Sequence, residues 1–228
     1  MSASATEGLA RNVGLTLSRM LLAVVAGLGL SVVLARALGP AGNGVFGVAV
    51  LIPMMLASFL NLGIGPANAY FVGRGATSTR EALATSLAMG ALMSAVCTLV
   101  GAAMIAWRGE AWFPGVPEAV LWSALLAFPP FLLSQLVASI HQGAQAFRRF
   151  NLVTLTGPLA TLVLTIVLVV GFSRGPASAL VAFAIGHALA VALGIGALAR
   201  DLREAGPASE PALRWRSIRT SVGYGWKA

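Results

Sequence analysis

Charged residues are scarce in this sequence: they make up 10% of its 228 residues, while hydrophobic residues make up 58%. A soluble globular domain carries about 25% charged residues, so the composition excludes that class. The seven acidic residues are Glu7, Glu81, Glu110, Glu118, Asp201, Glu204 and Glu210. All of them lie outside the long apolar runs or at their ends. A buried carboxylate that couples transport to protons or cations is therefore not expected.

Residues that carry enzyme chemistry are also missing. The single cysteine, Cys97, lies inside an apolar run and is expected to behave as a small buried hydrophobic residue. No His, Cys, Asp or Glu cluster has the spacing of metal ligands, and no Gly-Lys-Ser/Thr loop suggests a nucleotide phosphate site. No Ser/His/Asp set or carboxylate pair suggests catalysis. We therefore predict a protein that is not an enzyme and has no cofactor.

The sequence does contain long apolar runs rich in Ala and Leu. About 20 apolar residues cross the hydrocarbon core of a bilayer. Six runs reach that length, at 15–38, 45–71, 82–107, 119–140, 152–172 and 177–198. Because backbone groups in lipid must be paired within the chain, and no run alternates as a strand does, each is predicted to be a helix. Six glycines are expected to let these helices pack closely: Gly27, Gly29, Gly90, Gly101, Gly186 and Gly194.

Two breaks in these helices are expected from glycine and proline. Residues 34–50 join the first two runs, and Gly39-Pro40 must end a helix, since proline lacks the N–H and restricts the residue before it. We predict a very short hairpin there. In the second run, Pro66 and the glycines beside it are expected to interrupt the hydrogen-bond ladder.

The net charge of +8 follows the ends of the apolar runs and does not form a patch with exposed aromatic residues, so nucleic-acid binding is not expected. Three basic residues fall on one side of the predicted membrane: Arg36, Arg108 and Arg174. Twelve fall on the other: Arg11, Arg19, Arg74, Arg80, Arg148, Arg149, Arg200, Arg203, Arg214, Arg216, Arg219 and Lys227. The positive-inside rule predicts a multi-pass protein of the cytoplasmic (inner) membrane with both termini in the cytoplasm.

The last residues form a basic, amphipathic segment. Four apolar residues share one helical face: Trp215, Ile218, Val222 and Trp226. The segment is either a helix on the cytoplasmic leaflet or the start of a seventh span, and its likeness to the N-terminal lead-in favours the second. We therefore predict an all-α integral membrane protein with a six-helix lobe at residues 1–200. Residues 201–228 would be a basic cytoplasmic linker and the start of a truncated second lobe.

Three segments resemble the polysaccharide-type flippases of the multidrug/oligosaccharidyl-lipid/polysaccharide exporter superfamily. LARALGPAGNGVFGVAV at 34–50 resembles the turn between their first two helices. LNLGIGPANAYFVGRG at 60–75 resembles the end of their second helix, and HQGAQAFRRFNLVTL at 141–155 resembles their loop between helices four and five. The six-run pattern extends this resemblance over the whole length.

The resemblance implies the N-terminal half of a V-shaped transporter with two six-helix lobes. Such a protein moves lipid-linked oligosaccharide or polysaccharide precursors across the membrane by alternating access. The expected partners are a lipid carrier with an anionic pyrophosphate, membrane lipids, and glycosyltransferases or a polymerase. One alternative is a multidrug or cation antiporter of the same superfamily, which the missing acidic residues disfavour. Another is a membrane scaffold that holds glycan-synthesis enzymes without transporting. A third is a membrane-embedded transferase, which the lack of a catalytic cluster disfavours.

Arg19 is the first candidate for substrate binding. It lies just inside the first apolar run, where a charge costs about 2.5–3.5 kcal/mol on insertion scales. A guanidinium binds two phosphate oxygens at once, so Arg19 is a candidate contact for a lipid pyrophosphate. The resemblance supports this role, because lipid II flippases of the superfamily have arginines in the first helix. The alternative is an arginine that extends to the headgroups.

The other candidate residues lie at loops and at the broken second run. Arg74, Arg80, Arg148 and Arg149 are expected to form a basic entrance for an anionic lipid carrier, with ordinary positive-inside charge as the alternative. Asn61 and Asn68 are candidates to bind sugar hydroxyls, with hydrogen bonding between helices as the alternative.

Two histidines complete the set of polar residues in or near the runs. His187, midway along the sixth run, either titrates in a coupling cycle or forms hydrogen bonds inside the bundle. His141, at a helix end, is expected at the membrane interface.

Overall fold

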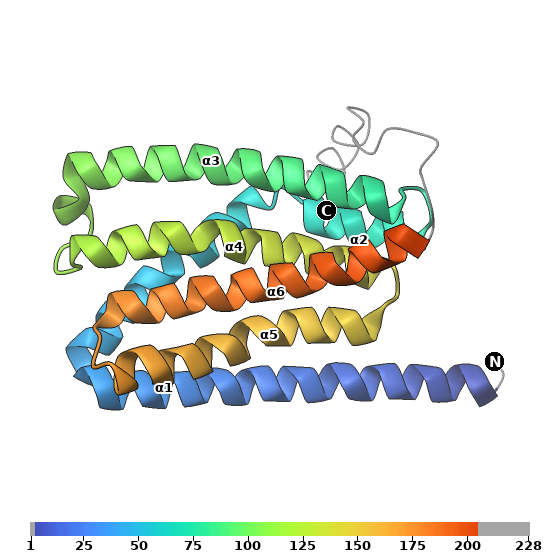
Figure 1. Cartoon of the computed structure of the whole chain (residues 1–228), viewed down its shortest axis with the longest axis horizontal. Coiled ribbons are helices and arrows are strands. Elements are labelled where there is room, and N and C mark those ends of the chain that lie inside the picture. The colour runs from blue at the N-terminus through green and yellow to red at the C-terminus, as the bar shows by residue number, and fades with distance from the viewer. Residues whose placement is uncertain (1–2, 205–228) are drawn as a thin grey trace.

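The computed structural model describes the backbone of residues 3–204 and the side chains of residues 14–203. The side chain of Arg11 and the predicted seventh helix lie outside this range. Within it, the elements are α1 (Ala3–Leu60), α2 (Ile64–Gly73), α3 (Thr79–Trp112), α4 (Glu118–Gly143), α5 (Phe147–Thr165), a π-helical continuation η1 (Ile166–Gly171) and α6 (Pro176–Glu204). They form an elongated bundle of roughly parallel and antiparallel helices (Figure 1).

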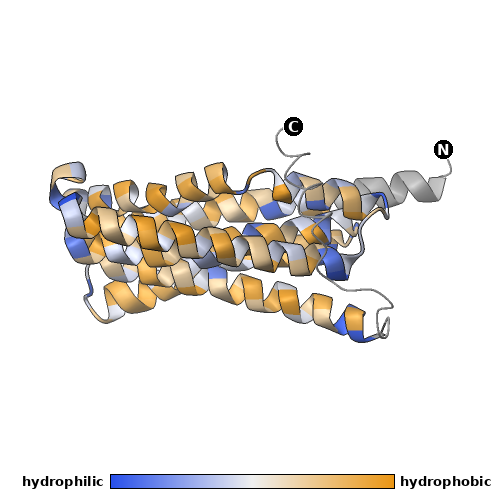
Figure 2. Ribbon diagram, turned by 90° about the horizontal axis from the view of Figure 1, so that it is seen from above, coloured by the Kyte–Doolittle hydropathy of each residue, from blue (hydrophilic) through white to orange (hydrophobic). Residues whose placement is uncertain are grey.

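Five of these helical stretches are long and apolar enough to cross a membrane, and the first covers 47 residues, Gly14–Leu60. Helix α1 breaks at Gly39, and the chain turns back there (Figure 1). It therefore has a first arm, residues 3–38, and a second arm, residues 40–60. With α1 counted as two spans, the six predicted spans are present. Figure 2 shows apolar residues along most of the bundle and hydrophilic residues gathered near its two ends.

The turn at Gly39 needs no loop. Gly39 has φ 69° and ψ −179°, a conformation that is essentially open to glycine alone. Pro40 follows as the first residue of the second arm, where its missing N–H is not needed and its fixed φ suits a helix. The hairpin predicted over residues 34–50 is therefore confirmed, and its connection is a single residue.

Replacing Gly39 by alanine is expected to lower the free energy of unfolding by about 1–3 kcal/mol, because a Cβ strains this backbone conformation. Gly44→Ala is the matched control: no atom lies within 4 Å of the added Cβ, and the position is helical. The measurement is denaturant unfolding of the purified protein in detergent micelles. Equal stability of the two variants would contradict the role assigned to Gly39.

The second span is interrupted, as predicted, but not at the proline. Leu62 has φ 45° and Gly63 has φ 71°, and these two residues separate the second arm of α1 from α2. Pro66 lies in the first turn of α2, where a helix has no use for its N–H. Gly63, in its left-handed conformation, therefore makes the break, and the first turn of α2 accommodates Pro66.

Helix α4 lies at the centre of the bundle. It packs against α1, α2, α3, α5 and α6, and it has the largest buried share of any of the spanning helices. α5 and α6 form the most extensive helix pair. The first arm of α1 packs on α5, and α3 packs mainly on α4. The first arm of α1 and α3 are therefore the two peripheral helices, and grooves lie along their edges.

Most of the predicted close approaches occur at the glycines. A Cβ at Gly90 would lie 2.6 Å from Leu133, and one at Gly101 would lie 2.6 Å from Leu125. Gly186 and Gly194 on α6 are equally crowded, by α5 and by Val137 and Val153. The prediction for Gly27 is wrong, because nothing lies within 4 Å of the Cβ position: Gly27 is on the exposed side of the first arm, whereas Gly29 meets Leu162 of α5.

Candidate functional site

The arginines of the described residues divide between the two ends of the bundle. One end holds the α2–α3 and α4–α5 connections and the end of α6 (Figure 1). Its arginines are Arg19, Arg74, Arg80, Arg148, Arg149, Arg200 and Arg203. The opposite end, with the Gly39 turn and the α3–α4 and α5–η1–α6 connections, holds Arg36, Arg108 and Arg174. We call the first the arginine-rich end.

A groove at the arginine-rich end brings three of the predicted site residues together. It lies between the first arm of α1 and the beginning of α5, with a volume of about 610 Å³. Arg19 comes from α1, and Arg148 and Arg149 come from α5. The remaining lining residues are Leu15, Ser18, Leu22, Asn151, Leu152 and Leu155. The groove therefore combines cationic groups with an apolar wall, and we call it the arginine groove.

Arg19 lies in this groove without a hydrogen-bond partner for its Nε, which is buried. Its guanidinium carbon lies 5.5 Å from the centroid of the Phe150 ring, so the cation stacks on an aromatic face of α5. The packing of the first arm on α5 holds it there. A buried polar group without a partner destabilises the fold by about 1–3 kcal/mol, and more when it is charged. An anion in the groove would offset this penalty.

The two adjacent arginines of α5 differ in what they already bind. Arg149 forms an ion pair and hydrogen bond with Asp201 near the end of α6, which ties α5 to α6. Arg148 is exposed and has no ion pair or hydrogen bond to another described residue. Arg148 and Arg19 are therefore the two cations of the groove that remain available to a ligand.

Asn151 is a groove residue that sequence reasoning missed. Its Nδ2 and Oδ1 are both buried and have no hydrogen-bond partner among the described residues. It follows Arg148 by three positions on α5, so the two side chains share a helical face. The i, i+3 spacing of Arg148 and Asn151 was therefore the feature of the sequence that could have placed Asn151 beside a predicted site residue. An amide with a free donor and a free acceptor beside two cations suits a ligand that offers both phosphate oxygens and hydroxyls.

The asparagines of the second span lie elsewhere and serve the bundle. Asn61 accepts a hydrogen bond from the N–H of Gly65 through Oδ1 at 3.0 Å, which caps the break before α2. Asn68 is buried, and its Nδ2 donates to Ser86 Oγ at 2.8 Å and to Ser139 Oγ at 3.1 Å. These bonds join α2 to α3 and α4. The structure does not bring either asparagine to the arginine groove.

The arginines of the α2–α3 connection are also outside the arginine groove. Arg74 donates a hydrogen bond to the hydroxyl of Tyr70, and its guanidinium carbon lies 5.1 Å from the centroid of that ring. Arg80 donates to the carbonyl of Leu202 at 3.3 Å, which links the start of α3 to the end of α6. The expected basic entrance is thus divided between two places, and only the α4–α5 pair lines the groove.

Both histidines are hydrogen-bonded inside the bundle. His187 lies with Nδ1 3.0 Å from Ser134 Oγ, and this hydroxyl also lies 2.7 Å from the carbonyl oxygen of Phe131. His141 lies in the last turn of α4, as expected, and its side chain is fully buried there, with Nε2 3.1 Å from the carbonyl oxygen of Gly194. Gly194 allows α6 to approach α4 closely enough for this bond.

Comparison with known proteins gives one family and one fold. The family described as polysaccharide biosynthesis protein matches residues 9–227. None of the curated proteins matches the sequence. A MOP superfamily transporter from Pyrococcus furiosus is similar in structure, with 18% identity and a TM-score of 0.66, and the match covers 91% of this chain and 49% of that one. The description of that transporter says that the reverse polarity of its binding pocket suggests a different function.

An outward-facing multidrug resistance transporter of the MATE family, also in the MOP superfamily, is similar too. It is 16% identical with a TM-score of 0.63, and the match covers 91% of this chain and 48% of that one. The chain thus spans about half the length of both solved transporters. At these identities the likeness shows the fold: a helical lobe like one half of a MOP transporter.

Proposed function

The chain belongs to the polysaccharide biosynthesis protein family, and on this basis we propose that it forms one lobe of a flippase for lipid-linked oligosaccharide or polysaccharide precursors. Its spanning helices make it a multi-pass membrane protein. The observation that carries the proposal is the arginine groove. Two available guanidinium groups and an unpartnered buried amide lie there on a wall of leucines. This combination matches a carrier with an anionic pyrophosphate and a hydrocarbon tail.

The groove would bind such a carrier through each of its parts. Arg19 and Arg148 would pair with the phosphate oxygens, since a guanidinium presents two parallel donors. The amide of Asn151 would complete the hydrogen bonding of the pyrophosphate or of the first sugar. Leu15, Leu152 and the other apolar residues would contact the beginning of the prenyl chain. Low surrounding polarity strengthens each of these charged contacts relative to water.

In the proposed transport cycle, this lobe and a second lobe alternate between two openings, and the arginine groove receives the carrier at the cytoplasmic side. The arginine-rich end is the cytoplasmic one in this proposal, as the positive-inside rule predicts. The four described carboxylates lie near helix ends, and none is buried. This supports an anionic substrate over the cationic drugs of an antiporter.

The test is binding of three prenyl compounds of equal chain length to the purified protein in nanodiscs. Polyprenyl pyrophosphate is expected to bind at least about tenfold more tightly than the neutral polyprenol, with the monophosphate between them, because charge-assisted hydrogen bonds contribute about 1.5–3 kcal/mol each. Equal affinity for all three would overturn the proposal. Tighter binding of a lipophilic phosphonium cation would favour the antiporter.

Asp201→Asn provides a variant that should improve binding in the same titration. It releases Arg149 from its ion pair and leaves a third available guanidinium in the groove. Both side chains of the pair are 43% exposed, so its loss is expected to cost no more than about 1 kcal/mol of stability. The expected gain in pyrophosphate affinity is about two- to fivefold, with no gain for the polyprenol. A gain for both compounds would show that charge is not the cause.

A further inference from the structure

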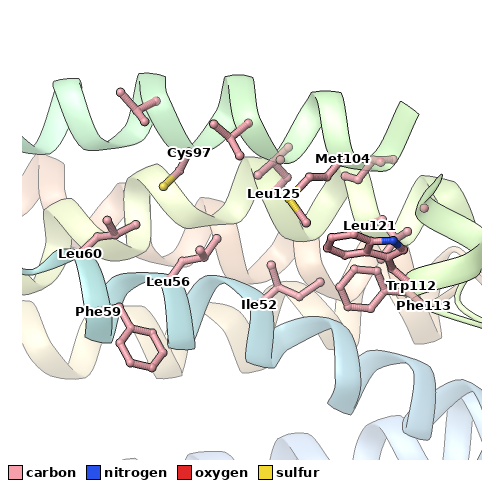
Figure 3. A pocket seen from close by; sticks show the side chains of 15 residues that line it. Ile52, Leu56, Phe59, Leu60, Cys97, Met104, Trp112, Phe113, Leu121 and Leu125 are labelled. Atoms are coloured by element: carbon pink, nitrogen blue, oxygen red, sulfur yellow. The ribbon is translucent and has the colours of Figure 1, made fainter. Parts of the chain in front are cut away.

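A second groove lies on the opposite half of the bundle, and its walls are almost entirely apolar. It runs between the second arm of α1 and α3, with α4 as its floor, and has a volume of about 480 Å³ (Figure 3). Its side chains include Ile52, Leu56, Cys97, Met104, Leu121 and Leu125. It exists because α3 and the second arm both pack on α4 and make little contact with each other. We call it the apolar groove.

The apolar groove adjoins a hollow at the end of α3 that is lined by charged residues. The hollow has a volume of about 980 Å³ and shares Ile105, Gly109 and Leu121 with the groove. Helix α3 leaves helical geometry at Arg108, with φ −151° and ψ 35°, so its last turn changes direction just where the groove meets the hollow. The two spaces are therefore adjacent; we call them together the cavity, with the apolar groove as its long part and the hollow as its mouth.

The mouth carries charges of both signs that are not paired with each other. Arg108, Glu110 and Glu118 line it and are exposed. Arg108 contacts its own neighbour, with its guanidinium carbon 5.8 Å from the Trp107 ring centroid. Glu118 accepts a hydrogen bond from Trp122 Nε1 at 3.0 Å. None of the three is in an ion pair among the described residues.

We propose that the cavity binds a zwitterionic phospholipid whose headgroup carries a primary ammonium. One acyl chain occupies the apolar groove, the phosphate pairs with Arg108, and the ammonium pairs with Glu110 and Glu118. The groove lies within spanning helices, where lipid chains are the surrounding solvent. This site is separate from the arginine groove, and the inference does not depend on the transported substrate.

The charges of the mouth select among headgroups. A purely anionic headgroup would meet two carboxylates and only one guanidinium, so its net interaction is unfavourable. A quaternary ammonium balances the charge but has no N–H to donate to a carboxylate. A primary ammonium has three N–H donors, which match the acceptors of Glu110 and Glu118.

Native mass spectrometry of the purified full chain tests this site. The protein is titrated with phosphatidylethanolamine, phosphatidylcholine and phosphatidylglycerol of identical acyl chains. Phosphatidylethanolamine is expected to be retained most and phosphatidylglycerol least, with about two- to fivefold between them, as exposed charge pairs allow. Equal retention of the three lipids, or preference for phosphatidylglycerol, would overturn the proposal.

Matched variants separate the groove from the mouth. Val100→Trp, which fills the apolar groove, is expected to reduce retention of all three lipids, whereas Leu99→Trp on the exposed side of the same helix leaves retention unchanged. Glu110→Gln is expected to abolish the preference for phosphatidylethanolamine over phosphatidylglycerol. Arg36→Gln, which changes an arginine that does not line the mouth, keeps that preference. Identical behaviour within either pair would contradict the assignment.

Discussion

Replacing Arg19 by methionine is expected to lower the affinity for polyprenyl pyrophosphate about 10- to 100-fold and to leave the protein as stable as before or more stable. The affinity falls because a charge-assisted hydrogen bond worth about 1.5–3 kcal/mol is lost. Stability does not fall, because the buried Nε of Arg19 has no hydrogen-bond partner, so the substitution leaves no other buried polar group without a bond. Methionine also fills the space against Phe150 with an unbranched apolar chain.

Two further variants make this result specific. Arg36→Met changes the arginine near the other end of the same arm, which is exposed, and is expected to leave the affinity unchanged. Arg19→Lys keeps the charge but not the planar fork, so its affinity should lie between those of the wild type and Arg19→Met. Isothermal titration in nanodiscs and thermal unfolding give the two quantities. An Arg19→Met protein that binds normally, or one that unfolds much more easily, would contradict the assigned role.

Gly186→Ala is expected to destabilise the bundle strongly, because the added methyl group would collide with the backbone of α5. The added Cβ would lie 2.8 Å from the carbonyl oxygen of Gly157 and 2.9 Å from the backbone nitrogen of Thr161. Neither backbone atom can move without shifting α5, whose contact with α6 is the most extensive in the fold. Forced overpacking of this kind costs about 1–3 kcal/mol, and in a membrane helix the close approach is itself the source of the packing energy.

The matched control for that substitution lies on the same helix. Gly196→Ala adds the same methyl group where no atom lies within 4 Å, and it should be neutral or slightly stabilising. Denaturant unfolding in micelles measures both variants, and size-exclusion chromatography reports whether Gly186→Ala still yields a single species. Similar unfolding free energies for the two variants would show that α5 and α6 can separate at little cost.

Hydropathy located the spans because lipid imposes one requirement on every spanning segment. The runs predicted at 82–107, 119–140 and 177–198 are found within α3, α4 and α6. The helices extend beyond the runs, α3 to Trp112 and α6 to Glu204, because helical hydrogen bonding continues into the polar interface after the apolar residues end. Hydropathy therefore indicates which residues contact lipid, whereas the length of a helix depends on how far its backbone hydrogen bonding continues.

Local backbone geometry was harder to predict than the spans. Pro66 was the obvious breaker in the second span, yet the break occurs at Leu62 and Gly63, because a proline is harmless in the first turn of a helix. His141 was placed at the interface from its position near a helix end. Its burial depends on the approach of α6 at Gly194, a contact between residues 53 positions apart that no local pattern reveals.

The candidate site was partly predictable for a physical reason. Arg19 stood out because a charge inside an apolar run needs an explanation, and it does line a groove with Arg148. Arg74 stood out as a basic residue of a predicted cytoplasmic loop and Asn68 as a polar residue in a broken span, but hydrogen bonds to other residues of the protein already engage both. Whether a polar side chain is satisfied by its neighbours depends on tertiary contacts. For the same reason Asn151, with two unpartnered atoms, was not singled out.

Because the two arms of α1 are connected by Gly39 alone, a small change in its backbone torsion angles would move the far end of either arm by a large distance. Arg19 is 20 residues from Gly39, which corresponds to about 30 Å of helix. A rotation of about 10° about the two backbone bonds of Gly39 would therefore carry Arg19 through about 5 Å, the pitch of one helical turn. Ile52 and Leu56 in the apolar groove lie on the other side of that joint. With no other residue between the arms, the torsion angles of Gly39 fix the direction of the arm that carries Arg19 relative to the arm that lines the apolar groove.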